Sequence, residues 1–237
     1  MATKRPRARR YHHGNLKETL IESALGLIAE VGPLAFTLRE VARRAGVSHN
    51  APYRHFHDRN DLLAAVAAEG FDRLTESMNQ AAASGRTPLE QLRLAGRGYV
   101  AFALRWPEHF AVMFDLPLPH DKYPALAAAG ARAFGVLADL VRSCQEAGAL
   151  REGDAMQYAL LAWSLVHGIA KLAIGGQLPQ AFEARAQNGV RREAAPDTYG
   201  GARRTLCAFE KAALEFCDFA TASLTVGIAG GNADRLD

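Results

Sequence analysis

One short segment of the first quarter of the chain has the most distinctive chemistry. Hydroxyl, imidazole, amide and phenol groups lie close together there, on Ser48, His49, Asn50, Tyr53 and His55. Such groups bind phosphate oxygens, and an asparagine amide can also pair with the edge of an adenine. The segment therefore has the chemistry of a nucleic-acid contact surface.

Two helix signals position this segment. Thr37 and Glu40 have the spacing of a capping box, so one helix is expected to begin there, and Gly46 is typical of the residue just past a helix end. A second helix is expected to begin at Ser48. The pattern predicts a helix-turn-helix, whose second helix enters the major groove of DNA. Pro52 has no amide hydrogen, so we expect that helix to be short or irregular.

Charge is distributed unevenly along the chain. Residues 1–60 hold eleven Lys or Arg against five Asp or Glu, a net charge of +6, although the whole chain carries only +3. A basic segment joined to a slightly acidic body indicates a nucleic-acid-binding end. Within it, residues 4–10 form a basic arm that is either a solvated tail or a segment for the minor groove.

Hydrophobic periodicity near 3.6 residues, without strand alternation, predicts an all-α protein of about nine or ten helices. Besides the helix-turn-helix pair, the expected helices cover residues 15–31, 58–83, 88–105, 110–114, 123–147, 154–175 and 202–226. The expected domain boundaries follow from these helices. They give a basic arm at 1–13, a helix-turn-helix domain at 14–60, a connecting helix at 61–84, a helical domain at 85–228 with a long loop at 176–202, and a frayed tail at 229–237.

Location and redox state follow from simpler features. We find neither a signal-peptide core nor an uninterrupted apolar run of roughly 18 residues, so we expect a cytoplasmic protein without membrane contact. Cys144, Cys207 and Cys217 are an odd number without C-x-x-C spacing. They are expected to be reduced packing residues, and a redox sensor is the alternative.

Catalysis is the main rival interpretation. His12-His13 and His55-Phe56-His57 invite a metal or hydrolase reading. However, the sequence has no His-Glu-x-x-His, no Gly-x-Ser-x-Gly elbow and no phosphate-binding glycine loop. We therefore expect no enzyme activity, metal or cofactor.

Residues 12–75 resemble the TetR family of bacterial transcriptional regulators. The residues that carry the resemblance, in order, are Ala24, Gly32, Phe36-Thr37, Val41-Ala42, Ala45-Gly46-Val47-Ser48, Tyr53-Arg54-His55-Phe56 and Leu62-Leu63. Further along, residues 163–168 resemble the Trp-x-x-x-His-Gly signature of one subgroup of its C-terminal domains. The resemblance implies a three-helix DNA-binding domain followed by a ligand-binding and dimerisation domain.

The resemblance also implies phosphate contacts for Tyr53, His55 and Arg59. Base contacts would come from the start of the second helix, and Phe56 is expected in the core, an alternative that stays open for Tyr53. The expected DNA-binding residues are Thr37, Arg39, Ser48, His49, Asn50, Ala51, Tyr53, Arg54, His55 and Arg59.

A ligand cavity is implied among the middle helices. Its candidate residues are Tyr99, Phe102, Trp106, Phe110, Met113, Phe114, Phe134, Trp163 and His167, although an ordinary packed core explains each of them individually. Trp163, His167 and Lys171 share one helix face. His167 or Lys171 could orient a polar ligand group, bond a backbone carbonyl or lie at a dimer surface.

Dimerisation is implied through the last two long helices, where small residues would permit close approach: Ala162, Gly168, Ala170 and Ala173. The expected function is a homodimeric repressor that binds a palindromic double-stranded DNA operator and is released by a small hydrophobic or aromatic effector. A transcriptional activator, or a regulator without a small-molecule ligand, is the alternative.

Overall fold

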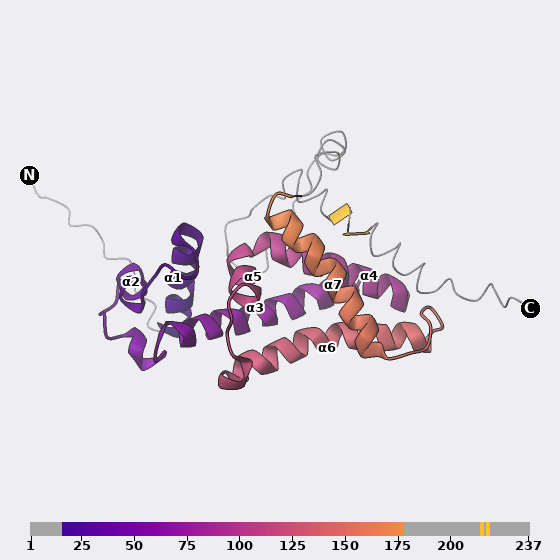
Figure 1. The fold of residues 1–237 in the computed structure, drawn as a ribbon, viewed down its shortest axis with the longest axis horizontal. Helices are drawn as coiled ribbons and strands as arrows, with labels where there is room; N and C mark the ends of the chain where they lie inside the picture. The colour runs from indigo at the N-terminus through magenta and orange to yellow at the C-terminus, as the bar shows by residue number, and fades with distance from the viewer. Residues whose placement is uncertain (1–15, 178–213, 216, 219–237) are drawn as a thin grey trace, which may run out of the picture. The chain divides into compact units, whose positions relative to one another are not determined.

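The computed structural model describes residues 16–177 together with Leu214, Glu215, Cys217 and Asp218. Over residues 16–177 it contains seven α-helices and two single-turn 3-10 helices (Figure 1). The chain divides into two compact units after Val66. The expected arm at 1–13, most of the loop at 176–202, most of the helix at 202–226 and the tail at 229–237 lie outside the described residues.

The first unit is built from α1 (Leu16–Val31), α2 (Leu38–Arg44) and the 3-10 turn η1 (Pro52–Arg54), followed by the start of α3. The predicted capping box opens α2. The Glu40 amide donates to Thr37 Oγ1 at 3.3 Å, and the Thr37 amide donates to Glu40 Oε2 at 2.8 Å. These bonds with Thr37 hold the pKa of the Glu40 carboxyl below its ordinary value. The start of the helix-turn-helix is therefore fixed locally.

The expectation of a helix beginning at Ser48 is wrong. Residues 48–51 form a turn, closed by a 2.9 Å bond from the Ala51 amide to the Ser48 carbonyl, and only Pro52–Arg54 is helical. Pro52 cannot donate a hydrogen bond back to this turn, so the chain makes a single 3-10 turn instead of an α-helix. The irregularity expected from Pro52 is confirmed, and it extends over the whole segment.

The second unit is an array of helices around α4. After α3 (Arg59–Ala82) come α4 (Pro88–Arg105), α5 (Pro107–Phe114), the 3-10 turn η2 (His120–Lys122), α6 (Pro124–Glu146) and α7 (Ala155–Ile174). α4 packs against α6 and α7, which also pack against each other (Figure 1). Thr87 and Asp154 cap α4 and α7. η2 was not expected, since the predicted helices leave residues 115–122 outside any helix.

By length and composition alone, α6 and α7 could cross a membrane. The expectation that no segment reaches that length was based on uninterrupted apolar runs, which is a stricter criterion. Both helices contact α4 and carry ion pairs to other helices, Arg132 of α6 with Asp72 and Lys171 of α7 with Asp115. Part of the apolar surface of both helices is therefore packed within the second unit.

Gly98 brings α4 close to the backbone of α3. A Cβ atom at this position would lie 2.6 Å from the Ser77 carbonyl oxygen and 3.0 Å from the Ala81 Cβ. The Ser77 hydroxyl donates to the Gly98 carbonyl at 2.9 Å and so ties the two helices together at the same place. Only glycine permits this approach.

Replacing Gly98 with alanine should therefore destabilise the protein by about 1–3 kcal/mol, because the added methyl group would push α4 away from α3. Gly135 of α6 is a matched control, since a Cβ there meets no atom within 4 Å. Gly135→Ala should stabilise by about 0.5–1 kcal/mol through helix propensity. Urea unfolding would measure both changes. Equal effects of the two substitutions would contradict the close contact at Gly98.

Candidate nucleic-acid interface and ligand pocket

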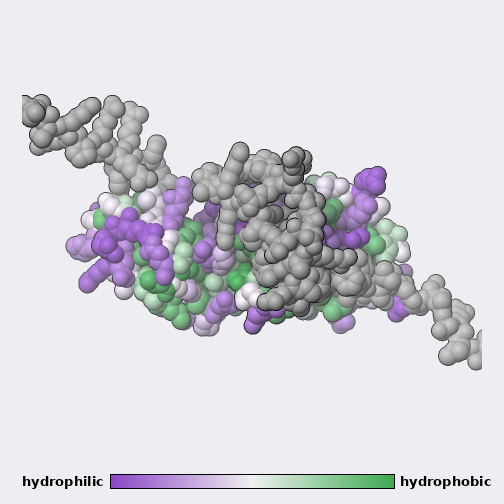
Figure 2. All heavy atoms as spheres, turned by 90° about the horizontal axis from the view of Figure 1, so that it is seen from above, coloured by the Kyte–Doolittle hydropathy of each residue, from purple (hydrophilic) through white to green (hydrophobic). Residues whose placement is uncertain are grey.

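The first unit presents its polar side chains to solvent. Figure 2 shows hydrophilic side chains gathered over the part of the molecule that holds α1 and α2. Of the ten residues expected to bind DNA, only Ala51 and Arg59 are half-buried. The other eight are exposed: Thr37, Arg39, Ser48, His49, Asn50, Tyr53, Arg54 and His55. The structure therefore leaves these eight accessible to a partner.

Two of the expected DNA-binding residues have other partners within the unit. The Thr37 hydroxyl accepts from the Glu40 amide and donates to Glu40 Oε2 at 2.9 Å. Arg59 Nη1 donates to the Leu34 carbonyl at 2.6 Å. An arginine has further N–H donors, whereas the hydroxyl proton of Thr37 is already used. Arg59 can thus contact a phosphate while bound to Leu34, and Thr37 acts first as a helix cap.

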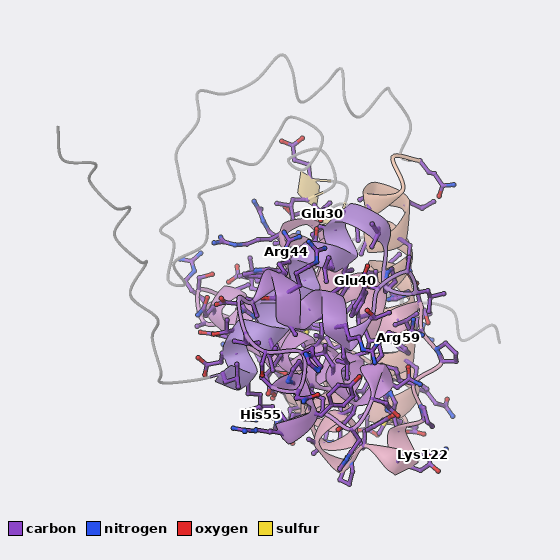
Figure 3. All side chains as sticks on the ribbon, turned by 90° about the vertical axis from the view of Figure 1, so that its left-hand side faces the viewer. Glu30, Glu40, Arg44, His55, Arg59 and Lys122 are labelled. Atoms are coloured by element: carbon purple, nitrogen blue, oxygen red, sulfur yellow. The ribbon has the colours of Figure 1, made fainter. Side chains whose placement is uncertain are left out.

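An ion pair holds α2 against α1. Arg44 Nη1 lies 2.7 Å from Glu30 Oε1, and Figure 3 shows the two side chains next to each other, away from His55. The Arg44 guanidinium lies directly over Gly26, where a Cβ would come within 2.6 Å of it. Arg44 therefore joins the two helices and is separate from the surface around His55.

Two aromatic residues of the short turn have different surroundings. The Tyr53 side chain is 49% exposed, whereas Phe56 is only 2% exposed and belongs to the core of the first unit. Burial of Phe56 agrees with its expected role in packing. The Tyr53 hydroxyl is available to donate a hydrogen bond, which is the requirement for a phosphate contact.

The second unit contains a cavity of about 300 Å³ that is partly open to solvent. Its lining is mostly aromatic and aliphatic and comes from α3 to α7 and η2: Phe71, Leu74, Met78, Tyr99, Met113, Phe114, His120, Gly130, Ala133, Phe134, Leu137 and Trp163. A space of this size and polarity fits a small organic molecule.

The sequence identified the cavity lining in part. Five candidates line it, namely Tyr99, Met113, Phe114, Phe134 and Trp163, whereas Phe102, Trp106, Phe110 and His167 do not. The lining from α3, His120 of η2 and three of the four lining residues of α6 were missed. Small residues at Gly130 and Ala133, on one face of an otherwise apolar helix, were the available signal, because they leave space instead of filling it.

A hydrogen-bonded chain crosses the cavity wall from α7 to α4 and back. Trp163 Nε1 donates to the Tyr99 hydroxyl at 3.1 Å, and that hydroxyl lies 2.8 Å from His167 Nδ1. Burial raises the pKa of Tyr99 above its usual range. These two hydrogen bonds join Trp163 and His167 of the Trp-x-x-x-His-Gly pattern to Tyr99, which the pattern does not contain.

His167 lies outside the cavity lining, among aromatic rings and beside an ion pair. Its ring stacks on Phe110 with centroids 5.3 Å apart and meets Phe114 edge-on at 4.7 Å. Lys171, one turn further along α7, pairs with Asp115 at the end of α5. Burial and then the Lys171 charge lower the pKa of His167, and Asp115 opposes them. His167 is therefore favoured in its neutral form.

Two of the four small residues of α7 that were expected at a dimer surface have partners within the unit. Ala170 and Ala173 are buried within the unit, so they pack against neighbouring helices and cannot meet a second copy. At Gly168 a Cβ would meet no atom within 4 Å.

Both cysteines within the described residues, Cys144 and Cys217, are buried, which raises their thiol pKa values to about 11 and about 12.

A partly buried polar cluster joins α3 to α5. His109 is only 3% exposed, and its Nε2 lies 3.7 Å from Glu69 Oε1. Arg73 Nη2 donates to the same carboxylate oxygen at 2.6 Å. His109 first, and Arg73 second, lower the pKa of Glu69 to about 2, although burial acts in the opposite direction.

Two family models match the chain. Residues 20–66 match the model described as bacterial regulatory proteins, tetR family. Residues 92–194 match the model described as tetracyclin repressor-like, C-terminal domain. The first match lies within the first unit, and the second match, which begins inside α4 and includes α7, lies within the second unit.

Individual proteins are similar to most of the chain. A solved structure of a protein of unknown function from Rhodococcus sp. RHA1 is 30% identical, with a TM-score of 0.68, and covers 91% of this chain and 98% of that one. An uncharacterized HTH-type transcriptional regulator of Mycobacterium tuberculosis is 26% identical over 68% of this chain and 71% of its own. AibR, solved with isovaleryl coenzyme A and operator DNA, is 20% identical, with a TM-score of 0.54 over 65% of this chain and 85% of that one.

The Glu69 cluster predicts a pH dependence of stability. A carboxyl whose pKa falls from 4.5 to about 2 on folding stabilises the protein above pH 4.5, and this contribution is lost as the pH falls towards 2. At pH 7, Glu69→Gln should lower the free energy of unfolding by on the order of 2 kcal/mol, a value already reduced for solvent screening of a partly exposed group.

Urea unfolding at pH 7, 5 and 3 would measure this difference between the wild-type and variant chains. The difference should shrink between pH 5 and pH 3. Glu152→Gln, at an exposed carboxylate, is the control and should change stability little at any pH. A difference between wild type and Glu69→Gln that is independent of pH would contradict the ionic role of Glu69.

Proposed function

Because this chain belongs to the TetR family and is a DNA-binding transcriptional regulator, not an enzyme, we propose that it is a dimeric repressor released by a small hydrophobic effector. One observation carries this proposal. The chain combines an exposed, hydrogen-bonding helix-turn-helix surface in one unit with an apolar cavity of about 300 Å³ in the other. A regulator that binds DNA and responds to a small molecule needs a DNA-binding surface and a ligand-binding cavity.

Contact with DNA would be made mainly by the exposed side chains of the turn and of η1. Tyr53, Arg54 and His55 would bind phosphates and fix the position of the unit, while Ser48, His49 and Asn50 would reach base edges. Arg39 could contact a phosphate or a guanine, and Ala51 a thymine methyl group. Arg59 would contact a phosphate with the N–H groups not bound to Leu34.

Dimer formation would double a small DNA contact and match a palindromic operator. Exposed apolar side chains on α7 support a second copy as the partner: Met156, Leu160, Leu161, Leu172 and Ile174. Gly168 lies on the same helix with open space beside it. Exposed apolar side chains that gather on one surface are typical of a protein interface, and by helical spacing Leu161 and Leu172 share the face of Gly168.

The effector would occupy the cavity of the second unit. AibR, which has the same fold, was solved with both isovaleryl coenzyme A and operator DNA, so a protein of this fold can bind both kinds of partner. An effector regulates only if it binds the DNA-competent and DNA-incompetent forms with different affinities. The Trp-x-x-x-His-Gly residues, through Trp163, would form part of its site.

Tyr53→Phe should weaken binding to the intergenic DNA beside the gene by about tenfold, because a hydrogen bond to a charged phosphate is lost. Its thermal stability should stay unchanged, since Tyr53 is half exposed. Fluorescence anisotropy at fixed salt would measure affinity, with Tyr158→Phe as the matched control. Sedimentation of the DNA complex should show two copies per site. Unchanged affinity, or one copy per site, would contradict this part of the proposal.

Hydrophobic compounds that raise the melting temperature should lower operator affinity. Ala133 is buried and lines the cavity, so Ala133→Phe should fill it and abolish the effect of these compounds, whereas Gly135→Ala on the same helix should not. Anisotropy of labelled operator during titration would show both results. The effector mechanism is contradicted if compounds that bind the cavity leave operator affinity unchanged, which is the behaviour expected of an activator or of a regulator without a ligand.

A further inference from the structure

The cavity offers few polar groups. Among its lining residues in the described part of the chain, only Tyr99, His120 and Trp163 carry hydrogen-bonding groups, and none is Lys, Arg, Asp or Glu. An ionised ligand would lose its hydration there without gaining a counter-charge from those residues, which is costly. The lining therefore favours an uncharged molecule.

The direction of each hydrogen bond at Tyr99 follows from its partners. An indole N–H can only donate, so the Tyr99 oxygen accepts from Trp163 at 3.1 Å. Tyr99 is only 1% exposed, and its own proton needs an acceptor, which His167 Nδ1 provides at 2.8 Å. The opposite arrangement, with His167 donating, would leave the buried Tyr99 proton without an acceptor among the described residues.

This arrangement requires a neutral His167. The titratable groups that face its ring are Tyr99 of α4, Asp115 at the end of α5, and Lys171 one turn along α7. Burial and Lys171 lower the pKa of His167, so its ring is neutral at pH 7, and with the ring proton on Nε2 its Nδ1 keeps a lone pair. Tyr99 then donates to His167 and accepts from Trp163. The second lone pair of its oxygen has no partner within the described residues.

We propose that Tyr99 is the polar anchor of the cavity and that His167 orients it as a hydrogen-bond acceptor. The ligand class is then a neutral, mainly apolar molecule that carries one hydroxyl group or similar donor. A donor on the ligand would complete the three hydrogen bonds that a phenol can make. This inference rests on the proposed role of the cavity as the effector site, and it adds which polar group the effector carries.

Three probes of similar shape test whether the cavity prefers a hydrogen-bond donor. 4-Butylphenol can donate a hydrogen bond, 4-butylanisole can only accept one, and butylbenzene can do neither. Isothermal titration calorimetry on the full chain at pH 7.5 should show 4-butylphenol binding roughly tenfold tighter than the other two. Tyr99→Phe should remove this preference and leave the affinity for butylbenzene unchanged. Tyr158→Phe, the same change on a tyrosine outside the cavity lining, should keep the preference.

His167→Leu tests the orienting role. Without the imidazole acceptor, the Tyr99 proton becomes available, so 4-butylanisole should gain roughly tenfold in affinity relative to butylbenzene. Acidification tests the same step without a mutation, because a protonated His167 donates from Nδ1 and no longer accepts. The preference for 4-butylphenol should then fall and the affinity for 4-butylanisole should rise.

Different failures have different meanings. Equal binding of the three probes by the wild-type chain would overturn the Tyr99 anchor and leave the cavity as an effector site. Loss of the preference in His120→Ala but not in Tyr99→Phe would overturn it as well, since His120 would then be the anchor. If no probe binds the wild-type chain, the anchor is overturned, and the proposed effector site loses its support too.

Discussion

The helix packing of the second unit depends on the contacts that α4 makes through two consecutive residues, Gly98 and Tyr99. At Gly98 its backbone comes within van der Waals distance of α3, and at Tyr99 its side chain reaches α7 through two hydrogen bonds. Successive residues of a helix point in different directions, so one turn of α4 fixes both neighbours. These contacts hold α3 and α7, which both line the cavity, against α4.

Sequence patterns predicted the features that depend on local chemistry. The capping box of Thr37 and Glu40, the caps at Thr87 and Asp154, and the limits of α4, α6 and α7 all follow from residues within a few positions of each other. The irregular segment after Gly46 followed from Pro52 alone, although its extent did not. Such signals act over one turn, which is why they can be read without tertiary structure.

The cavity could be predicted only in part, because its chemistry joins distant residues. Tyr99 and His167 are 68 positions apart, and each looks like an ordinary core or surface residue within its own helix. Apolar periodicity shows which face of a helix is buried, but a buried residue can pack against a neighbour or border an empty space. Phe102 and Phe110 are buried against neighbours, whereas Phe114 borders the cavity. All three have the same apolar pattern in the sequence.

The position of Trp163 has an optical consequence. The chain has only two tryptophans, and they lie in different surroundings: Trp163 borders the cavity with its indole N–H bound to Tyr99, while Trp106 lies near the guanidinium groups of Arg73 and Arg105. Indole emission depends on local polarity and hydrogen bonding. With Trp106 replaced by phenylalanine, the protein would carry one native fluorophore in the wall of its own cavity, and occupancy could be followed without any label.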